Sequence, residues 1–153
     1  MRQYGVADVE LLREPIVPAK ARMKIWYVSA YDQPGGQSTR THDYSMEMVR
    51  RGHEVTMFTN GYCHFRHTER LCADESWRVE MMNGLRVVWL KTRPYVGNGF
   101  GRGLNMLDNM RRVLQASKAL REVPDVVLGP SVPLFTGWAA ARLADRYHVP
   151  FIF

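Results

Sequence analysis

Short apolar runs alternate with helical spacings along this chain. Residues 25–28 form an apolar run without polar alternation, which is typical of a parallel strand buried on both faces. The next segment shows the i, i+3, i+4, i+7 spacing of a helix, at Thr41, Tyr44, Ser45 and Met48. This spacing predicts a helix that begins at residue 38 or 39 and ends at Gly52, where a left-handed cap is expected. A β-rich run at 55–59 completes a strand-helix-strand unit, which the crossover rule makes parallel and right-handed.

The rest of the chain continues this alternation. Asn83-Gly84 lies between two β-rich arms and supplies the positive φ values of a type I′ turn, so a hairpin is predicted over 78–91. Residues 61–76 predict a long loop and 94–103 a glycine-rich loop. The remaining elements are a helix from Leu104 to before Pro124, a strand at 125–129, a helix at 134–147 and a strand at 150–153. The predicted fold class is α/β, a doubly wound, mostly parallel Rossmann-like sheet with helices on both faces, plus a hairpin.

Length and composition fit one domain. The 153 residues, of which 46% are apolar, can bury a single core. Residues 1–22 carry scattered charges and are predicted to be an extension outside the core, and the domain is predicted over 23–153 with its last strand truncated. No leader pattern and no apolar run of about 18 residues is visible, so a cytoplasmic location is expected. The two cysteines are compatible with a reducing compartment.

The net charge of +6 favours partners that carry phosphate. Nucleic acid, an anionic lipid or a nucleotide-activated metabolite would all meet this condition. The arginines are spread over several elements and form no dense basic run interleaved with aromatic residues. Direct binding of nucleic acid is therefore not favoured.

The turn at residues 32–37 is the first candidate binding site. Gly35 and Gly36, followed by Gln37, open the first helix where a Rossmann-type sheet binds phosphate, because glycine lets the backbone approach an anion. The alternative is a tight turn without a ligand. The turn is not a dinucleotide fingerprint or a P-loop, since neither G-x-G-x-x-G nor a following Gly-Lys-Ser/Thr is present.

The glycine-rich segment 97–103 is a second candidate, although a flexible loop without a ligand is the favoured interpretation. The functional alternative is a flap that faces a membrane or an acceptor. Its aromatic and basic residues, together with two arginines of the next helix, would form a membrane-proximal surface. The members of this surface are Tyr95, Phe100, Arg102, Arg111 and Arg112.

Two thiols and two imidazoles lie close together in the loop at 61–76. Cys63, His64, His67 and Cys72 have ligand chemistry for zinc, but strong zinc sites show tighter, paired spacings. A loop without a metal is therefore favoured. His42, one turn into the first helix on the ligand side, is a weaker candidate for a site residue.

Two stretches of the sequence resemble a known family. They are MKIWYVSAYDQPGGQSTRTHDYSMEMVRRGHEVTMFTN at 23–60 and PDVVLGPSVPLFTGWAAARLADRYHVPFIF at 124–153. Together they resemble the N-terminal domain of family 4 glycosyltransferases of the GT-B fold, and bacterial surface-polysaccharide enzymes look most similar. The resemblance implies transfer of a sugar from a nucleotide-sugar to an acceptor, in a cleft between two Rossmann-like domains. The nucleotide-sugar would be a substrate, and no metal or other cofactor is implied.

The resemblance also implies roles for residues and partners. Gly35, Gly36 and Gln37 would lie against the donor diphosphate, and the loops after Asn60, Arg93 and Gly129 would shape the acceptor side. The acceptor-side candidates are Arg40, His42, Tyr62, Arg93 and Ser131. The implied partners are the nucleotide-sugar, a lipid-linked or polysaccharide-precursor acceptor, the anionic inner face of the membrane and a separate C-terminal domain chain. Because the second domain holds the nucleotide in this family, the chain by itself is expected to be inactive and prone to associate.

One alternative function stays open at this point. The domain could be a non-catalytic Rossmann-like module that recognises a phosphorylated ligand or an anionic membrane. A nucleotide-dependent oxidoreductase is less favoured than either, because the dinucleotide fingerprint is absent.

Overall fold

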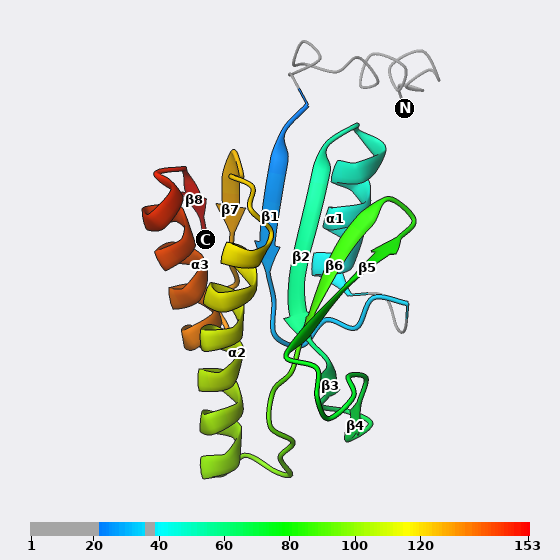
Figure 1. The fold of residues 1–153 in the computed structure, drawn as a ribbon, viewed down its shortest axis with the longest axis vertical. Coiled ribbons are helices and arrows are strands. Elements are labelled where there is room, and N and C mark those ends of the chain that lie inside the picture. The colour runs from blue at the N-terminus through cyan, green and yellow to red at the C-terminus, as the bar shows by residue number, and fades with distance from the viewer. Residues whose placement is uncertain (1–21, 36–38) are drawn as a thin grey trace, which may run out of the picture.

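The computed structural model describes residues 22–35 and 39–153, which form one α/β unit (Figure 1). In chain order the elements are β1 (Lys24–Val28), α1 (Arg40–Arg50), β2 (Glu54–Asn60), β3 (Tyr62–Cys63), β4 (Thr68–Glu69), β5 (Trp77–Met82), β6 (Leu85–Leu90), α2 (Phe100–Ala119), β7 (Val126–Leu128), α3 (Leu134–Tyr147) and β8 (Phe151–Ile152). All of the predicted extension except Arg22 lies outside the described residues.

The main sheet has six strands in the order β5-β6-β2-β1-β7-β8. All neighbouring pairs are parallel except β5 and β6, which form the antiparallel hairpin predicted around Asn83-Gly84. Both turn residues have the positive φ that a type I′ turn requires, 51° at Asn83 and 84° at Gly84. The strand order reverses between β1 and β7, which is the switch point where doubly wound sheets bind ligands. The predicted fold class is confirmed.

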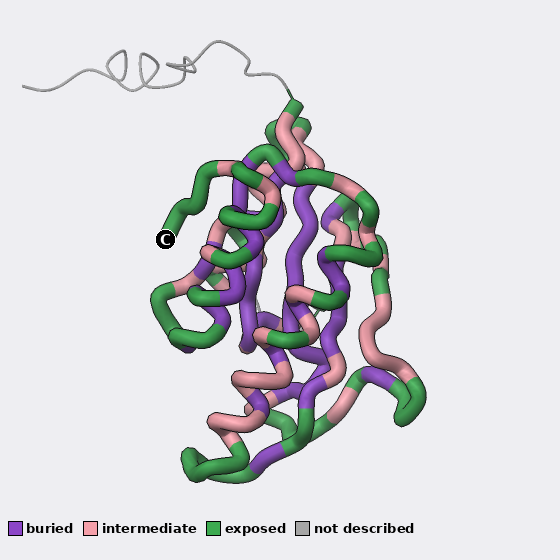
Figure 2. Tube along the Cα trace, turned by 60° about the vertical axis from the view of Figure 1, so that its left-hand side comes forward, coloured by how far each residue is buried: buried purple, intermediate pink, exposed green. Residues whose placement is uncertain are grey.

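Helices cover both faces of the sheet, with α1 on one face and α2 and α3 on the other (Figure 1). Successive strand residues point to opposite faces, so β1 buries Trp26 toward α2 and α3 and Ile25 toward α1. The buried strands therefore form the middle layer, drawn in purple in Figure 2. This arrangement explains why the strand sequences are apolar without alternation.

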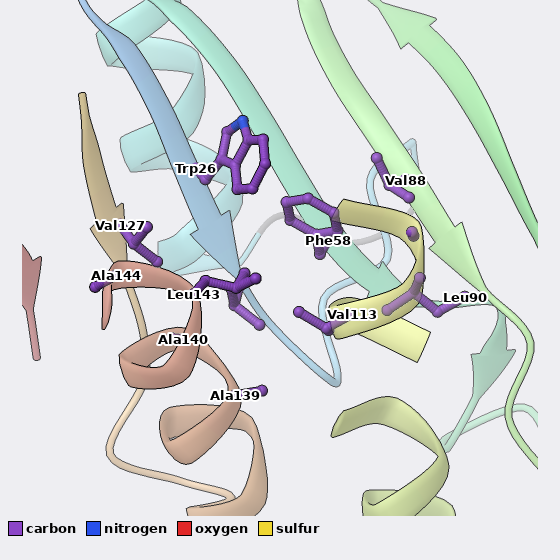
Figure 3. Close-up of a cluster of buried hydrophobic side chains, with 12 residues drawn as sticks. Trp26, Phe58, Val88, Leu90, Val113, Val127, Ala139, Ala140, Leu143 and Ala144 are labelled. Carbon is purple, nitrogen blue, oxygen red and sulfur yellow. The ribbon is translucent and has the colours of Figure 1, made fainter. Parts of the chain in front are cut away.

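The larger core lies between the sheet and the helices α2 and α3 (Figure 3). Trp26 packs edge-on against Phe58 and Tyr147, with ring centroids 5.3 and 5.1 Å apart. The small side chains Ala139 and Ala140 let α3 approach the strands closely. This core fixes the position of α2 and α3 relative to the strand ends that carry the candidate site.

Three local features differ from the predictions. Helix α2 begins at Phe100 and not at Leu104, because two glycines of the predicted loop continue the helix. The predicted long loop at 61–76 contains the small antiparallel hairpin β3–β4. Tyr44 was predicted on the packed face of α1 but is 57% exposed, since the helix packs through Met46, Met48 and Val49.

Candidate functional site

The candidate site lies where the parallel strands end. A cleft of about 540 Å³ opens there between the β1–α1 loop and the β3–β4 hairpin. The hairpin lies toward the lower end of Figure 1. The loop contributes Tyr31, Gln33, Gly35 and Thr39, and the hairpin side contributes Cys63, Phe65, Arg66, Thr68, Glu69 and Arg70, with Gly61 between them in sequence. A cleft of this volume at the carboxyl ends of the strands is the position and size expected for a small-molecule site.

The wall formed by the β1–α1 loop is held by buried hydrogen bonds. The Ser29 hydroxyl donates to the Asp32 carboxylate, and Thr59 Oγ1 donates to the Asp32 carbonyl at 2.6 Å. Gln33 Nε2 donates to the Asn60 carbonyl at 2.9 Å. These bonds fix the loop to the end of β2, so the loop presents its residues to the cleft in a defined position.

A second set of buried polar side chains lies behind this loop. Asn109, in the middle of α2, donates through Nδ2 to Asn60 Oδ1 at 2.6 Å and accepts from Thr136 Oγ1 at 3.0 Å. Asn105, one turn earlier, donates to Thr92 Oγ1 at 2.9 Å. We call Asn60, Asn105, Asn109 and Thr136 the asparagine network. It links β2, α2, α3 and the β6–α2 loop directly below the strand ends.

The hairpin wall is anchored by aromatic residues. The Tyr62 hydroxyl donates to the Tyr95 carbonyl at 2.5 Å and lies 2.9 Å from His67 Nδ1. The His64 ring stacks on Tyr95 with centroids 5.3 Å apart. Burial raises the pKa of Tyr95 to about 12, and the nearby Tyr31 hydroxyl adds to the shift. The hairpin is thereby attached to the β6–α2 loop through side chains.

Arg102 connects α2 to the other wall of the cleft. Its guanidinium lies 5.6 Å from the centroid of the Tyr31 ring and donates to the Tyr31 hydroxyl at 3.3 Å. The bond to Tyr31 raises the pKa of Arg102 further above its ordinary value. Tyr31 therefore lines the cleft, and its contact with Arg102 holds its side chain in position.

Of the predicted diphosphate residues, Gly35 lines the cleft. Its φ of +82° lies in the left-handed region, and a Cβ there would lie 2.7 Å from Met82 Cε. Gly36 and Gln37 lie outside the described residues.

None of the five predicted acceptor-side residues lines the cleft. Arg40 is exposed at the start of α1, and His42 follows it with a buried Nδ1 that has no hydrogen-bond partner and lies 3.6 Å from Asp43 Oδ1. Tyr62 is buried under the hairpin. Arg93 is exposed and forms an ion pair with Asp108 at 2.7 Å, which raises its pKa. Ser131 is exposed in the β7–α3 loop.

The predicted membrane-proximal residues do not form one exposed surface. Tyr95 is only 6% exposed, which differs from the expected position at a lipid interface, because its ring packs against His64 and Tyr62. Arg102 is engaged with Tyr31 and Asn98. Phe100 is 83% exposed. Arg111 is exposed on α2, and Arg112 is half-buried and donates to Gln115 Oε1 at 3.2 Å.

The possible zinc ligands are separated. Cys63 is buried and Cys72 is exposed, and both are free thiols. In residues 22–35 and 39–153, no three His, Cys, Asp or Glu side chains are grouped so that they could hold a metal ion. Within the same residues, no helix is both long and apolar enough to cross a bilayer.

The asparagine network was not predicted from the sequence. Asn105 and Asn109 are 1% and 0% exposed, so they occupy the most buried face of α2. Their i, i+4 spacing places both on one face of a helix, and this spacing was the signal that could have identified them.

The fold defines the chain as a Rossmann-like domain with a cleft at the carboxyl ends of its strands, the position where such sheets bind ligands. Residues 35–153 match the family described as Glycosyl transferase 4-like domain, and the chain belongs to this family. A glycosyltransferase-type function follows from this membership.

A solved structure shows the same fold. The C-terminal domain of a hydrogenase from Pyrococcus furiosus superposes with a TM-score of 0.56 at 18% sequence identity, over 89% of this chain and 94% of that chain. At this identity the likeness concerns the fold alone. A comparison with curated proteins gives no significant match.

Proposed function

We propose that this domain binds the acceptor in a reaction that transfers a sugar from a nucleotide-sugar to that acceptor. The observation that carries the proposal is the cleft of about 540 Å³ at the carboxyl ends of the strands, with Gly35 in its wall. The lining residues from Gly35 to Arg70 belong to the region that matches the glycosyltransferase family, and Tyr31 and Gln33 directly precede it. A sugar unit with its first linkage fits a site of this size.

The composition of the cleft supports binding of a polar, ring-shaped ligand. Tyr31 and Phe65 offer aromatic surface, and Gln33, Thr39 and Thr68 offer hydrogen-bonding groups. The contribution of such a site to catalysis is to hold the acceptor hydroxyl in line with the donor, which removes part of the entropic barrier.

The donor site is proposed at the glycine turn. Gly35 has the left-handed φ that brings backbone N–H groups toward a ligand, and the turn precedes α1, whose N-terminus carries a partial positive charge. A diphosphate held at Gly35 would lie beside an acceptor in the cleft, because Gly35 is part of the cleft wall. The acceptor-side roles of Arg40, His42, Tyr62, Arg93 and Ser131 stay predictions, and Arg40 is the member of this group nearest the turn in sequence.

A lipid-linked acceptor would bring the domain to a membrane, as expected for an enzyme of bacterial surface-polysaccharide synthesis. The exposed Phe100 and Val96, with Arg111 on the same helix as Phe100, support a weak peripheral contact. Each basic residue close to an anionic surface contributes about 1 kcal/mol. Cosedimentation with anionic vesicles at low salt, compared with neutral vesicles, measures this contribution.

The test of the proposed function is a transfer assay on this chain combined with the nucleotide-binding C-terminal domain that the resemblance implies, because the chain by itself is expected to be inactive. Labelled UDP-, GDP- and ADP-sugars are offered together with a membrane lipid extract. Thr68→Trp should fill the cleft at the exposed strand β4 and raise the KM for the acceptor, while donor binding is retained. Gln115→Trp, on the exposed side of α2 and outside the cleft, is the matched control. Transfer by Thr68→Trp at the wild-type KM would refute the assignment of the cleft, and no transfer from any donor would refute the function.

A further inference from the structure

We infer that the acceptor of this cleft is an acidic saccharide, in which one group carries negative charge and neighbouring hydroxyls are free. The inference rests on the proposed function and names its substrate class. Two charged side chains of the hairpin wall carry it, Arg66 and Glu69, and both line the cleft.

Arg66 is the cation that is available to a ligand. It is exposed near the tip of the β3–β4 hairpin, and within the described part of the chain it has neither an ion pair nor a hydrogen bond. The other arginine of the cleft is already engaged, since Arg70 lies 3.7 Å from the Glu80 carboxylate and 4.2 Å from the centroid of the Trp89 ring. An arginine without an internal partner in a cleft is suited to pair with the carboxylate or phosphate of a ligand.

Glu69 is the side chain suited to accept hydrogen bonds from the hydroxyls of a sugar. Its Oε1 accepts a hydrogen bond from the Leu71 N–H at 3.0 Å, whereas its Oε2 is buried without a hydrogen-bond partner. Lys91 Nζ forms only a long ion pair with Oε2, at 4.0 Å, and donates its hydrogen bonds to the carbonyls of Leu71 and Cys72. A buried carboxylate oxygen without a donor costs more than a neutral group would, so its presence in a cleft calls for a function.

The backbone around Glu69 is shaped to keep the carboxylate in place. A Cβ at Gly61 would lie 2.5 Å from Glu69 Oε1 and 3.1 Å from the Leu71 side chain, so the glycine lets the carboxylate pack closely against the backbone. The last torsion of a glutamate is soft, and a small rotation turns Oε2 toward the cleft. An ionised carboxylate can only accept hydrogen bonds, so it favours a ligand that donates, such as a pair of sugar hydroxyls.

The remaining part of the hairpin wall fits a sugar ring. Phe65 is 81% exposed at the hairpin, lines the cleft and follows directly in sequence before Arg66. Its aromatic face can cover the apolar C–H side of a pyranose while Arg66 pairs with the charge. A free anion without hydroxyls would leave Glu69 unused and would be repelled by it. A neutral sugar would leave Arg66 unused.

The inference is tested by NMR titration of the full chain with four probes. These are glucuronate, glucose 1-phosphate, glucose and inorganic phosphate. Glucuronate or glucose 1-phosphate should bind about tenfold more tightly than glucose, because a charge-assisted hydrogen bond is added. The comparison of these two acids shows whether the charge is a carboxylate or a phosphate. Inorganic phosphate should bind more weakly than glucose 1-phosphate.

Two conservative variants measure how much Arg66 and Glu69 each contribute to binding of the probes. Arg66→Gln should lower the affinity for the acid probes to that for glucose, and Arg142→Gln, an exposed arginine of α3 outside the cleft, should not. Glu69→Gln keeps an acceptor for the Leu71 N–H and should weaken binding of every sugar probe but not of inorganic phosphate. Amide spectra report whether each variant is folded.

Several results would overturn the inference. They are equal affinities for glucose and the acid sugars, no binding of any probe, or unchanged binding by Arg66→Gln or Glu69→Gln. Because transfer is measured separately in the assay described above, an active enzyme with these results would refute the substrate class and leave the proposed function standing.

Discussion

Replacement of Asn109 by leucine should destabilise the domain strongly, although it removes no apolar contact. The Asn109 side chain is fully buried, donates to Asn60 Oδ1 at 2.6 Å and accepts from Thr136 Oγ1 at 3.0 Å. Leucine has a similar size and leaves both partners buried without it. Each unpartnered group costs about 1–3 kcal/mol, so the two together cost about 2–6 kcal/mol. Thr136 can turn its hydroxyl toward the carbonyl of Pro133, the residue that caps the start of α3, which favours the lower part of this range.

Equilibrium unfolding in guanidinium measures this loss, with fluorescence of the buried Trp26 and Trp89 as the signal. A domain of this size has a stability of about 5–15 kcal/mol, so a loss of about 3 kcal/mol is a large share. It should lower the Tm by roughly 6–12 °C. Gln115→Leu, an exposed position of the same helix, should change stability by less than about 0.5 kcal/mol. A loss for Asn109→Leu of under about 1 kcal/mol would show that the asparagine network does not stabilise the fold.

Two further predictions concern glycine and tyrosine residues. Gly137→Ala should destabilise α3, because the new Cβ would lie 2.7 Å from the Pro130 carbonyl oxygen. Gly103→Ala meets nothing within 4 Å and should stabilise α2 by up to about 1 kcal/mol. Equal melting temperatures for the two variants would contradict this. Tyr95, with its pKa raised to about 12 by burial, should ionise above the ordinary tyrosine value of about 10 in an absorbance titration, so stability should fall as the pH rises from about 10 toward 12. Tyr95→Phe should remove both the late ionisation and this fall in stability, and a titration curve unchanged by the substitution would be the contrary result.

The central elements could be predicted from the sequence because their signals are local. The strand at 25–28, the Asn83-Gly84 hairpin and the helix at 134–147 each combine an apolar pattern with a matching end signal, and all three are present in the structure. Helix α2 was predicted to begin too late, because Gly101 and Gly103 are typical of loops. The first turn of a helix tolerates glycine better than its interior does, and here the turn is closed by the Arg102 N–H donating to the Gly99 carbonyl at 3.0 Å.

The cleft could be predicted only in part. Gly35 was found because glycine before a helix is a recognisable signal. The loop after Asn60 was expected on the acceptor side, but its fold as the β3–β4 hairpin was not predicted, since β3 and β4 have only two residues each and their sequence shows no alternation. Their position depends on contacts with residues far along the chain, such as the bond from Tyr62 to the carbonyl of Tyr95. The buried face of α2 was missed for a related reason, because Asn105 and Asn109 are polar and a search for apolar stripes passes over them.

The two walls of the cleft differ in how they are held, and this difference has a consequence for the proposed reaction. The β1–α1 loop is fixed by buried bonds to the end of β2, including those from Thr59 and Gln33. The hairpin has short strands and is anchored mainly through the side chains of Tyr62 and Glu69. A donor diphosphate at the glycine turn would therefore meet a preorganised wall, as transfer chemistry requires. The acceptor would meet the wall that is easier to reshape. We therefore expect substitutions in the hairpin to change which acceptor is used, and substitutions below the glycine turn to lower the rate for every acceptor.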